Sequence, residues 1–165
     1  MRIAGMVEES IVDGPGFRMA VFAQGCLQKC PGCHNPETHD PNGGREADTD
    51  DMIAVMRQNP LLDGITLSGG DPFLQPEPCL QLARAAHELG LNVWAYSGQT
   101  LDQLLALRAE RPFLRELLAE IDVLVDGPFL IERRTLDMRF RGSDNQRVID
   151  LPATLRSGSV VEKDI

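Results

Sequence analysis

The sequence contains no run of apolar residues that approaches the roughly 18 needed for a membrane-spanning helix. Its first residues, Met1 to Gly5, lack the charged and then apolar pattern of an export signal. No internal repeat, low-complexity tract or interdomain linker interrupts the 165 residues. These absences predict one compact domain over residues 1–155, a polar tail over 156–165, no membrane partner and a cytoplasmic location.

Basic residues are also scarce, because 16 Lys and Arg accompany 25 Asp and Glu, for a formal net charge of -9. Such an excess of negative charge argues against binding to a nucleic-acid backbone. In a reducing compartment the four cysteines are not expected to form structural disulfides. Three of them lie between Cys26 and Cys33, where metal binding or redox chemistry is the expected use, while Cys79 stands alone.

Short apolar segments of strand type alternate with segments of helical period. Strands are expected at residues 17–22, 64–67, 92–96 and 123–125, and helices at 49–59, 77–89, 101–109 and 113–119. Thr49 is expected to cap the first helix, and residues 146–151 to add a strand. This alternation predicts an α/β fold with a mostly parallel sheet.

Glycines follow three of the expected strands, in the segments Ser68-Gly69-Gly70, Ser97-Gly98 and Asp126-Gly127. The first expected strand leads directly into Cys26. The carboxyl ends of parallel strands share one edge of a sheet, and ligands bind at that edge because its loops are free to vary. The glycines and the cysteines are therefore expected to meet at one ligand site.

The spacing Cys-x3-Cys-x2-Cys of Cys26, Cys30 and Cys33 can turn three thiolates toward one centre. Soft thiolates suit zinc or iron-sulfur clusters, and a cubane cluster held by three cysteines keeps one iron with open coordination sites. The spacing alone leaves three alternatives: c-type haem attachment at residues 30–34, a thioredoxin-like pair of Cys30 and Cys33, or a structural zinc knot with His34 or His39. The missing export signal argues against haem attachment, and the Pro/Gly-rich loop after Cys33 argues against a thioredoxin-like helix.

Three cysteines at this spacing after a first strand, with a Gly-Gly pair after the next, resemble the radical S-adenosylmethionine superfamily. Residues 12–18 (VDGPGFR) and 33–36 (CHNP) resemble the activating enzymes of glycyl radical enzymes. Residues 125–129 (VDGPF) and 141–147 (RGSDNQR) resemble the branch of that group whose protein substrate is anaerobic ribonucleoside-triphosphate reductase. The similarity runs from about Gly5 to Leu151.

This resemblance implies an open, partial (β/α) barrel of the radical S-adenosylmethionine type and a 4Fe-4S cluster on Cys26, Cys30 and Cys33, which act in catalysis through the cluster. The implied reaction is reductive cleavage of S-adenosylmethionine and hydrogen abstraction from a glycine of the reductase, with a low-potential electron donor such as flavodoxin. One alternative is an activator of another glycyl radical enzyme such as pyruvate formate-lyase. A zinc-stabilised binding module is the alternative from a different class.

The resemblance also places S-adenosylmethionine against the cysteine loop and the strand ends, at Gly32, Cys33, His34, Gly69, Gly70, Ser97 and Asp126. Loops without Cβ atoms let backbone carbonyls approach a ligand, and the Asp126 carboxylate could accept from a ribose hydroxyl or cap a helix. Asp71 follows the Gly-Gly pair where the superfamily commonly has glutamate. Asp13 is expected to meet the target glycine loop, Arg18 to form an ion pair, and residues 139–147 to contact a carboxylate, a ribose or the partner's backbone.

Overall fold

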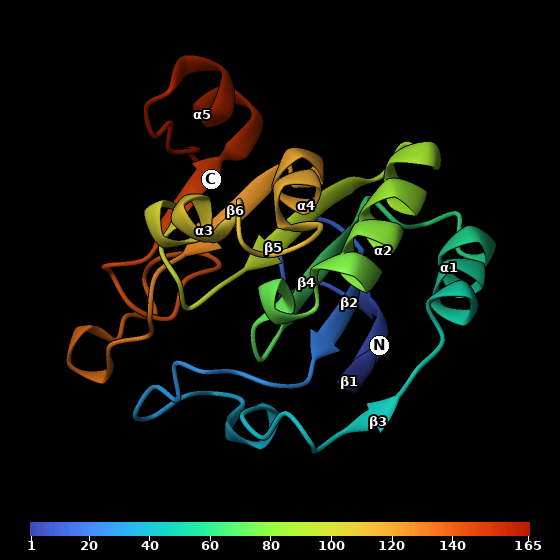
Figure 1. Ribbon diagram of the computed structural model, residues 1–165, viewed down its shortest axis with the longest axis horizontal. Coiled ribbons are helices and arrows are strands. Elements are labelled where there is room, and N and C mark those ends of the chain that lie inside the picture. The colour runs from blue at the N-terminus through green and yellow to red at the C-terminus, as the bar shows by residue number, and fades with distance from the viewer.

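All 165 residues are described by a computed structural model, in which one seven-stranded sheet carries helices on its face (Figure 1). The spatial strand order is β3-β1-β2-β4-β5-β6-β7. The bounds are β1 (Arg2–Ser10), β2 (Arg18–Ala23), β3 (Arg45–Glu46), β4 (Gly64–Gly69), β5 (Asn92–Tyr96), β6 (Val123–Asp126) and β7 (Arg147–Asp150). Strands β2, β4, β5 and β6 pair in parallel, whereas β1 and β7 flank them in antiparallel pairings. The predicted α/β fold with a parallel centre is confirmed, and β3 and β7 leave the sheet open at both edges.

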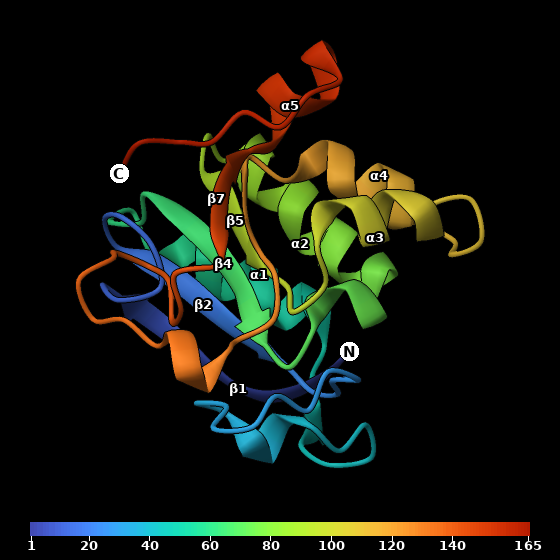
Figure 2. The same ribbon diagram turned by 90° about the vertical axis from the view of Figure 1, so that its left-hand side faces the viewer.

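The helices are α1 (Thr49–Gln58), α2 (Pro76–Glu88), α3 (Leu101–Leu107), α4 (Leu114–Glu120) and α5 (Leu151–Ser157). Three short 3-10 helices are η1 (Pro36–Thr38), η2 (Pro72–Leu74) and η3 (Ile131–Arg133). Figure 2 shows α2, α3 and α4 together on one side of the sheet. None of the helices is both long and apolar enough to span a membrane. Residues beyond α5 return to β7, where Ile149 and Glu162 form an isolated bridge.

Two features of the N-terminal half differ from the sequence prediction. Strands β1 and β3 were not expected from the sequence. Most residues of β1 are exposed or half-buried, and the polar residues Glu8 and Glu9 interrupt the apolar pattern that would indicate a strand. The N-cap of α1 is Asp48 rather than Thr49, since the Asp48 side chain accepts a hydrogen bond from Asp50 N. A carboxylate one residue earlier meets the free backbone N–H groups of the first turn equally well.

The hydrophobic core lies between the sheet and helices α1, α2 and α4. Cys79, on α2, belongs to this core and is fully buried. Its thiol lies 3.4 Å from Pro72 O, and burial raises its pKa to about 12. Cys79 is therefore a packed thiol, separate from the other three cysteines.

His87, at the end of α2, lies between two carboxylates. Its Nδ1 is 2.7 Å from Glu120 Oε2, and its Nε2 is 2.9 Å from Asp122 Oδ2. Partial burial acts to lower the pKa of His87, but the hydrogen bonds to Asp122 and Glu120 outweigh it and raise that pKa. The protonated imidazole is thus the form that stabilises the fold.

We expect the stability contributed by His87 to fall as pH rises. A histidine whose pKa is raised on folding contributes fully below its ordinary value of 6.5, and the contribution is lost as pH rises through the raised folded value. The difference in melting temperature between the wild type and His87→Gln should therefore be largest below pH 6.5 and shrink as the pH rises through the raised folded pKa of His87. A difference that does not change as the pH rises above 6.5 would contradict the assignment.

Candidate metal centre

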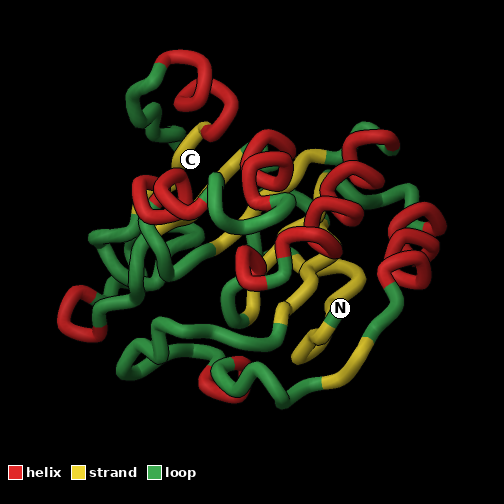
Figure 3. The backbone as a smooth tube through the Cα atoms, viewed as in Figure 1, coloured by secondary structure: helices red, strands yellow, loops and turns green.

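A cavity of about 840 Å³ lies at the carboxyl ends of the parallel strands. The segments after β2 and β6 are mostly loop, and each contains one short 3-10 helix, η1 or η3, as Figure 3 shows. The cavity is lined by most of the predicted site residues, namely Cys26, Cys30, Cys33, His34, Gly69, Gly70 and Ser97. Gly32 and Asp126 do not line it. The topology therefore brings the cysteines and the glycine loops together, as the strand order requires.

The cysteine loop turns sharply directly after β2. Gly25, Lys29 and Gly32 have positive φ values of 101°, 46° and 73°, which give the loop its tight curvature. Cys33 N donates to Cys30 O at 3.1 Å, and Asn35 N lies 3.4 Å from Cys33 Sγ. A backbone N–H group of the loop therefore points at the Cys33 sulfur.

Two opposing effects act on the pKa of the Cys26 thiol. Desolvation by burial raises its pKa, and backbone hydrogen bonds from Gln28 and Lys29 act in the opposite direction. The same two N–H groups would stabilise a metal-bound thiolate, whose charge is shared with the metal. The backbone N–H groups of Gln28 and Lys29 are therefore arranged around Cys26 Sγ.

The donor set fits an iron-sulfur cluster. No three His, Cys, Asp or Glu side chains converge as the ligands of a single metal ion would. The three thiols instead line the wall of one cavity. A cubane cluster binds each thiolate through a different iron, so its ligands stand farther apart than those of one zinc ion. His34, a candidate fourth zinc ligand, packs on Phe129 with ring centroids 5.2 Å apart.

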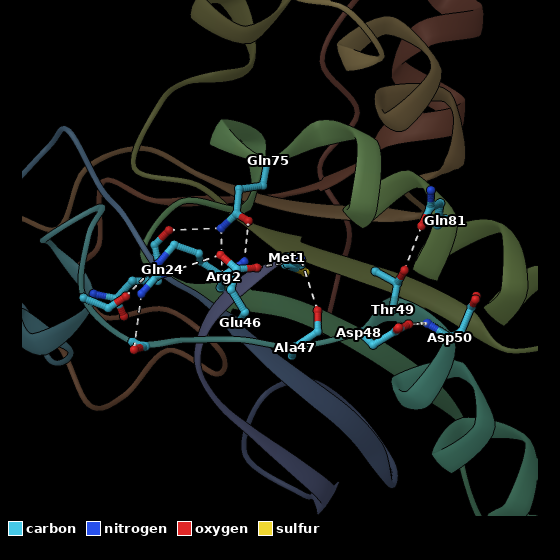
Figure 4. A network of polar contacts seen from close by, with 12 residues as sticks. Met1, Arg2, Gln24, Glu46, Ala47, Asp48, Thr49, Asp50, Gln75 and Gln81 are labelled. Carbon is cyan, nitrogen blue, oxygen red and sulfur yellow. Dashed lines mark hydrogen bonds and ion pairs between the residues drawn. The ribbon is translucent and has the colours of Figure 1, made fainter.

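Two glutamines fix the start of the cysteine loop (Figure 4). Gln24 is 3% exposed, and its Nε2 donates to Glu37 O at 2.9 Å and to Asp40 O at 2.7 Å. Gln75 exchanges two hydrogen bonds with the Arg2 backbone, at 2.9 and 2.8 Å, and its Nε2 also donates to Gln24 O at 3.1 Å. Sequence reasoning missed both residues, although Gln24 directly precedes the Gly-Cys pair that starts the loop.

We expect Gln24→Ala to loosen the cysteine loop. Removing the amide leaves Glu37 O without its side-chain donor, whereas Asp40 O keeps the hydrogen bond from Gly43 N at 3.0 Å. The loss of the two hydrogen bonds should cost about 1 kcal/mol in unfolding free energy. Bound iron should be lost to a chelator several-fold faster than from the wild type, as followed by visible absorbance under anaerobic conditions. Gln81→Ala is the matched control, because Gln81 on α2 accepts only from Thr49 Oγ1 on the surface. Equal rates of iron loss in the two variants would contradict the role of Gln24.

Gly69 and Gly70 are required by packing between two loops. A Cβ atom on Gly69 would lie 2.5 Å from Ala23 N, and one on Gly70 would collide with Gly25 O. The two loops are also joined directly, since Gly70 N donates to Ala23 O and Asp71 N donates to Gly25 O, both at 2.8 Å. The absence of Cβ atoms thus lets the glycine loop lie against the start of the cysteine loop.

Asp71 faces the protein rather than the cavity. Its side chain is buried, accepts from Phe73 N at 3.0 Å and accepts from Ser97 Oγ at 2.8 Å. Burial raises the pKa of Asp71, an effect that the hydrogen bonds from Ser97 and Phe73 oppose. Asp71 therefore positions Ser97 at the wall of the cavity and caps η2.

Asp126 is held by partners other than a ligand. Its carboxylate forms a two-point ion pair with Arg147, at 3.0 Å from Nε and 2.5 Å from the second nitrogen. It also accepts from Leu101 N, the first residue of α3, at 2.7 Å. The alternative role foreseen for Asp126, as the cap of a helix that starts after it, is wrong, because no helix begins directly after Asp126 and the N-cap of α3 is Thr100. Gly32 packs against Ile131, which a Cβ atom on Gly32 would approach to 2.6 Å.

Residues 127–146, which we call the strap, form the wall of the cavity opposite the glycine loop. Its two ends are tied to each other because Asn145 Nδ2 donates to Pro128 O and Gln146 Nε2 donates to Gly127 O. Lining residues that sequence reasoning did not single out include Gln28, Tyr96, Phe129 and Met138. Arg18, expected in an ion pair, is fully buried without one and donates instead to Thr66 Oγ1, Pro15 O and Ile65 O.

The comparisons with known proteins agree with this site. Residues 12–149 match the family model described as a 4Fe-4S single cluster domain. This match defines the class of protein as a domain that carries one 4Fe-4S cluster, and it spans the strands that position the cavity.

Individual relatives identify the family within this class of 4Fe-4S domains. The anaerobic ribonucleoside-triphosphate reductase-activating protein of Escherichia coli strain K12 is 35% identical over 147 residues, which are 84% of this chain and 91% of the relative. The protein of the same name from Salmonella typhi is 37% identical with the same coverage. The pyruvate formate-lyase-activating enzyme of Clostridium pasteurianum is 38% identical over 96 residues, 55% of this chain and 40% of that enzyme. The chain therefore belongs to the family of anaerobic ribonucleoside-triphosphate reductase-activating proteins, which are enzymes.

Proposed function

We propose that this enzyme activates anaerobic ribonucleoside-triphosphate reductase by generating a glycyl radical in it. The observation that carries the proposal is the convergence of Cys26, Cys30 and Cys33 with the Gly69-Gly70 loop on one cavity. Support also comes from the two reductase-activating relatives, which align over 91% of their length, whereas the pyruvate formate-lyase activator aligns over 40% of its own.

The three cysteines would hold a 4Fe-4S cluster through their thiolates. When bound, the cluster would supply the electron that cleaves S-adenosylmethionine to methionine and a 5′-deoxyadenosyl radical, which takes a hydrogen atom from the partner's glycine. The protein's own residues would bind and orient S-adenosylmethionine. Gly69 and Gly70 would present backbone groups to the methionyl ammonium, and Ser97, held by Asp71, would offer its hydroxyl from the opposite loop.

Because the sheet is open rather than closed into a barrel, we infer that the substrate is a protein. The sheet is not closed, because its edge strands β3 and β7 do not pair with each other, and the cavity is walled by the strap and by the loop before β2 rather than by further strands. We interpret this sheet as an open, partial barrel of the radical S-adenosylmethionine type. A partner's glycine segment could enter through the open side, where Ile11, Val12 and Leu136 are strongly exposed. The electron would come from a low-potential donor such as flavodoxin.

The test is anaerobic mixing of the reduced, cluster-loaded enzyme with S-adenosylmethionine and either the reductase or pyruvate formate-lyase. A glycyl radical doublet in the electron paramagnetic resonance spectrum of the reductase is the expected result. A signal only with pyruvate formate-lyase would support the other activator class. A colourless, zinc-replete protein that cleaves no S-adenosylmethionine would support the zinc-stabilised binding module and overturn the proposal.

A further inference from the structure

We propose that Arg141 binds a carboxylate inside the cavity, and that this carboxylate belongs to the methionine part of S-adenosylmethionine. The inference rests on the proposed function, because it names a ligand contact in the same cavity. Arg141 lies on the strap and lines the cavity together with the three cysteines and the glycine loop.

The Arg141 guanidinium lacks an anion. Its Nε is buried without any hydrogen-bond partner, and its one hydrogen bond runs from a terminal nitrogen to Gln146 O at 3.5 Å. None of the ion pairs of the chain includes Arg141. A cation that is partly removed from water needs a compensating negative charge, because its lost hydration is otherwise not replaced. The cavity wall thus contains a guanidinium whose charge has no partner in the protein.

No side chain of the cavity supplies that negative charge. Asp13 is the one carboxylate in the lining, and its Oδ2 accepts from Ser10 Oγ at 2.5 Å rather than pairing with an arginine. A planar guanidinium presents a fork of donors that matches a carboxylate at two points. Of the groups on S-adenosylmethionine, only the methionyl carboxylate carries a negative charge.

The backbone around Arg141 is fixed before any ligand arrives. Phe140 packs edge-on against Trp94 with ring centroids 5.4 Å apart, beneath the strap. On the other side, Gly142 N donates to Gln146 Oε1 at 2.8 Å, and Gln146 Nε2 donates to Gly127 O at 3.0 Å. Two anchored neighbours therefore set the position of Arg141, so little ordering is needed when a carboxylate binds.

Arg134 provides a matched control on the strap. It is exposed, does not line the cavity and takes part in no ion pair. Removing Arg134 therefore changes the charge of the strap equally, without removing a buried donor at the cavity.

The experiment measures equilibrium binding, not turnover. Anaerobically reconstituted full-length wild type, Arg141→Gln, Arg141→Lys and Arg134→Gln are titrated with S-adenosylmethionine and with its decarboxylated analogue. Arg141→Gln is expected to weaken S-adenosylmethionine binding about 10-fold to 100-fold, the range for losing hydrogen bonds between charged groups. Its affinity for the decarboxylated analogue should stay within about twofold of the wild type. The S-adenosylmethionine affinity of Arg141→Lys should fall between those of the wild type and Arg141→Gln, and Arg134→Gln should match the wild type.

Three results would overturn the inference. Equal weakening of both ligands by Arg141→Gln would show a general effect on the cavity, and unchanged affinity for both would show no contact. A normal S-adenosylmethionine affinity combined with a raised KM for the reductase would assign Arg141 to a carboxylate of the partner protein. If the wild type binds no S-adenosylmethionine, the proposed function itself fails, which is distinct from binding that is insensitive to Arg141.

Discussion

Replacing Cys26, Cys30 or Cys33 by alanine is expected to abolish the cluster and, with it, cleavage of S-adenosylmethionine. Each thiolate would be the sole protein ligand of one iron, so no neighbour can substitute for it. Anaerobically reconstituted wild type should be brown and contain about four irons and four sulfides, whereas each variant should retain little of either. Iron and sulfide analysis with visible spectroscopy measures the loss independently of activity.

The control is Cys79→Ala, which should keep the full cluster. Cys79 is fully buried in the core, does not line the cavity, and has a pKa raised to about 12 by burial. Its loss should lower stability modestly through the small cavity left in the core. A Cys79→Ala protein that folds but cannot hold iron would show that the set of three ligands is wrong.

Replacing Asp126 by alanine is expected to destabilise the fold more than any other single change discussed for the ligand site. Removing one partner from a buried ion pair typically costs about 3–5 kcal/mol, because the other charge stays buried and unpaired. The loss of unfolding free energy in Asp126→Ala should be at or below about 3 kcal/mol, because the Arg147 side chain is 30% exposed and keeps part of its hydration, while that of Asp126 is 1% exposed. Leu101 N also loses its acceptor. Chemical denaturation without ligands measures this effect.

A double-mutant cycle separates a structural role of Asp126 from a ligand contact. If the carboxylate acts through Arg147, then Asp126→Ala in an Arg147→Met background should cost clearly less than in the wild type. Affinity for S-adenosylmethionine per folded molecule should then change little. A stable Asp126→Ala protein with strongly reduced affinity would instead restore Asp126 as a cofactor-binding residue.

Arg18 and the two glutamines show why buried polar residues were hard to assign from the sequence. Arg18 follows the VDGPGF segment and suggested an ion pair, yet its donors go to a hydroxyl and three carbonyls. Gln24 and Gln75 lie 51 positions apart but meet through one hydrogen bond. Side-chain partners of this kind are set by strand order, so they become visible only after the sheet is assembled.

The sequence by itself determined the α/β alternation, the meeting of cysteine and glycine loops at one edge, and the family. These properties follow from local periodicity, from the short spacing of Cys26, Cys30 and Cys33, and from the rule that parallel strands share their carboxyl edge. The tertiary structure decided which of those residues face the cavity. It directed the Asp126 carboxylate to Arg147 and the Asp71 carboxylate to Ser97, while leaving Arg141 without an anion in the cavity wall. The orientation of a charged side chain depends on partners distant in sequence, and those partners are fixed by packing rather than by spacing.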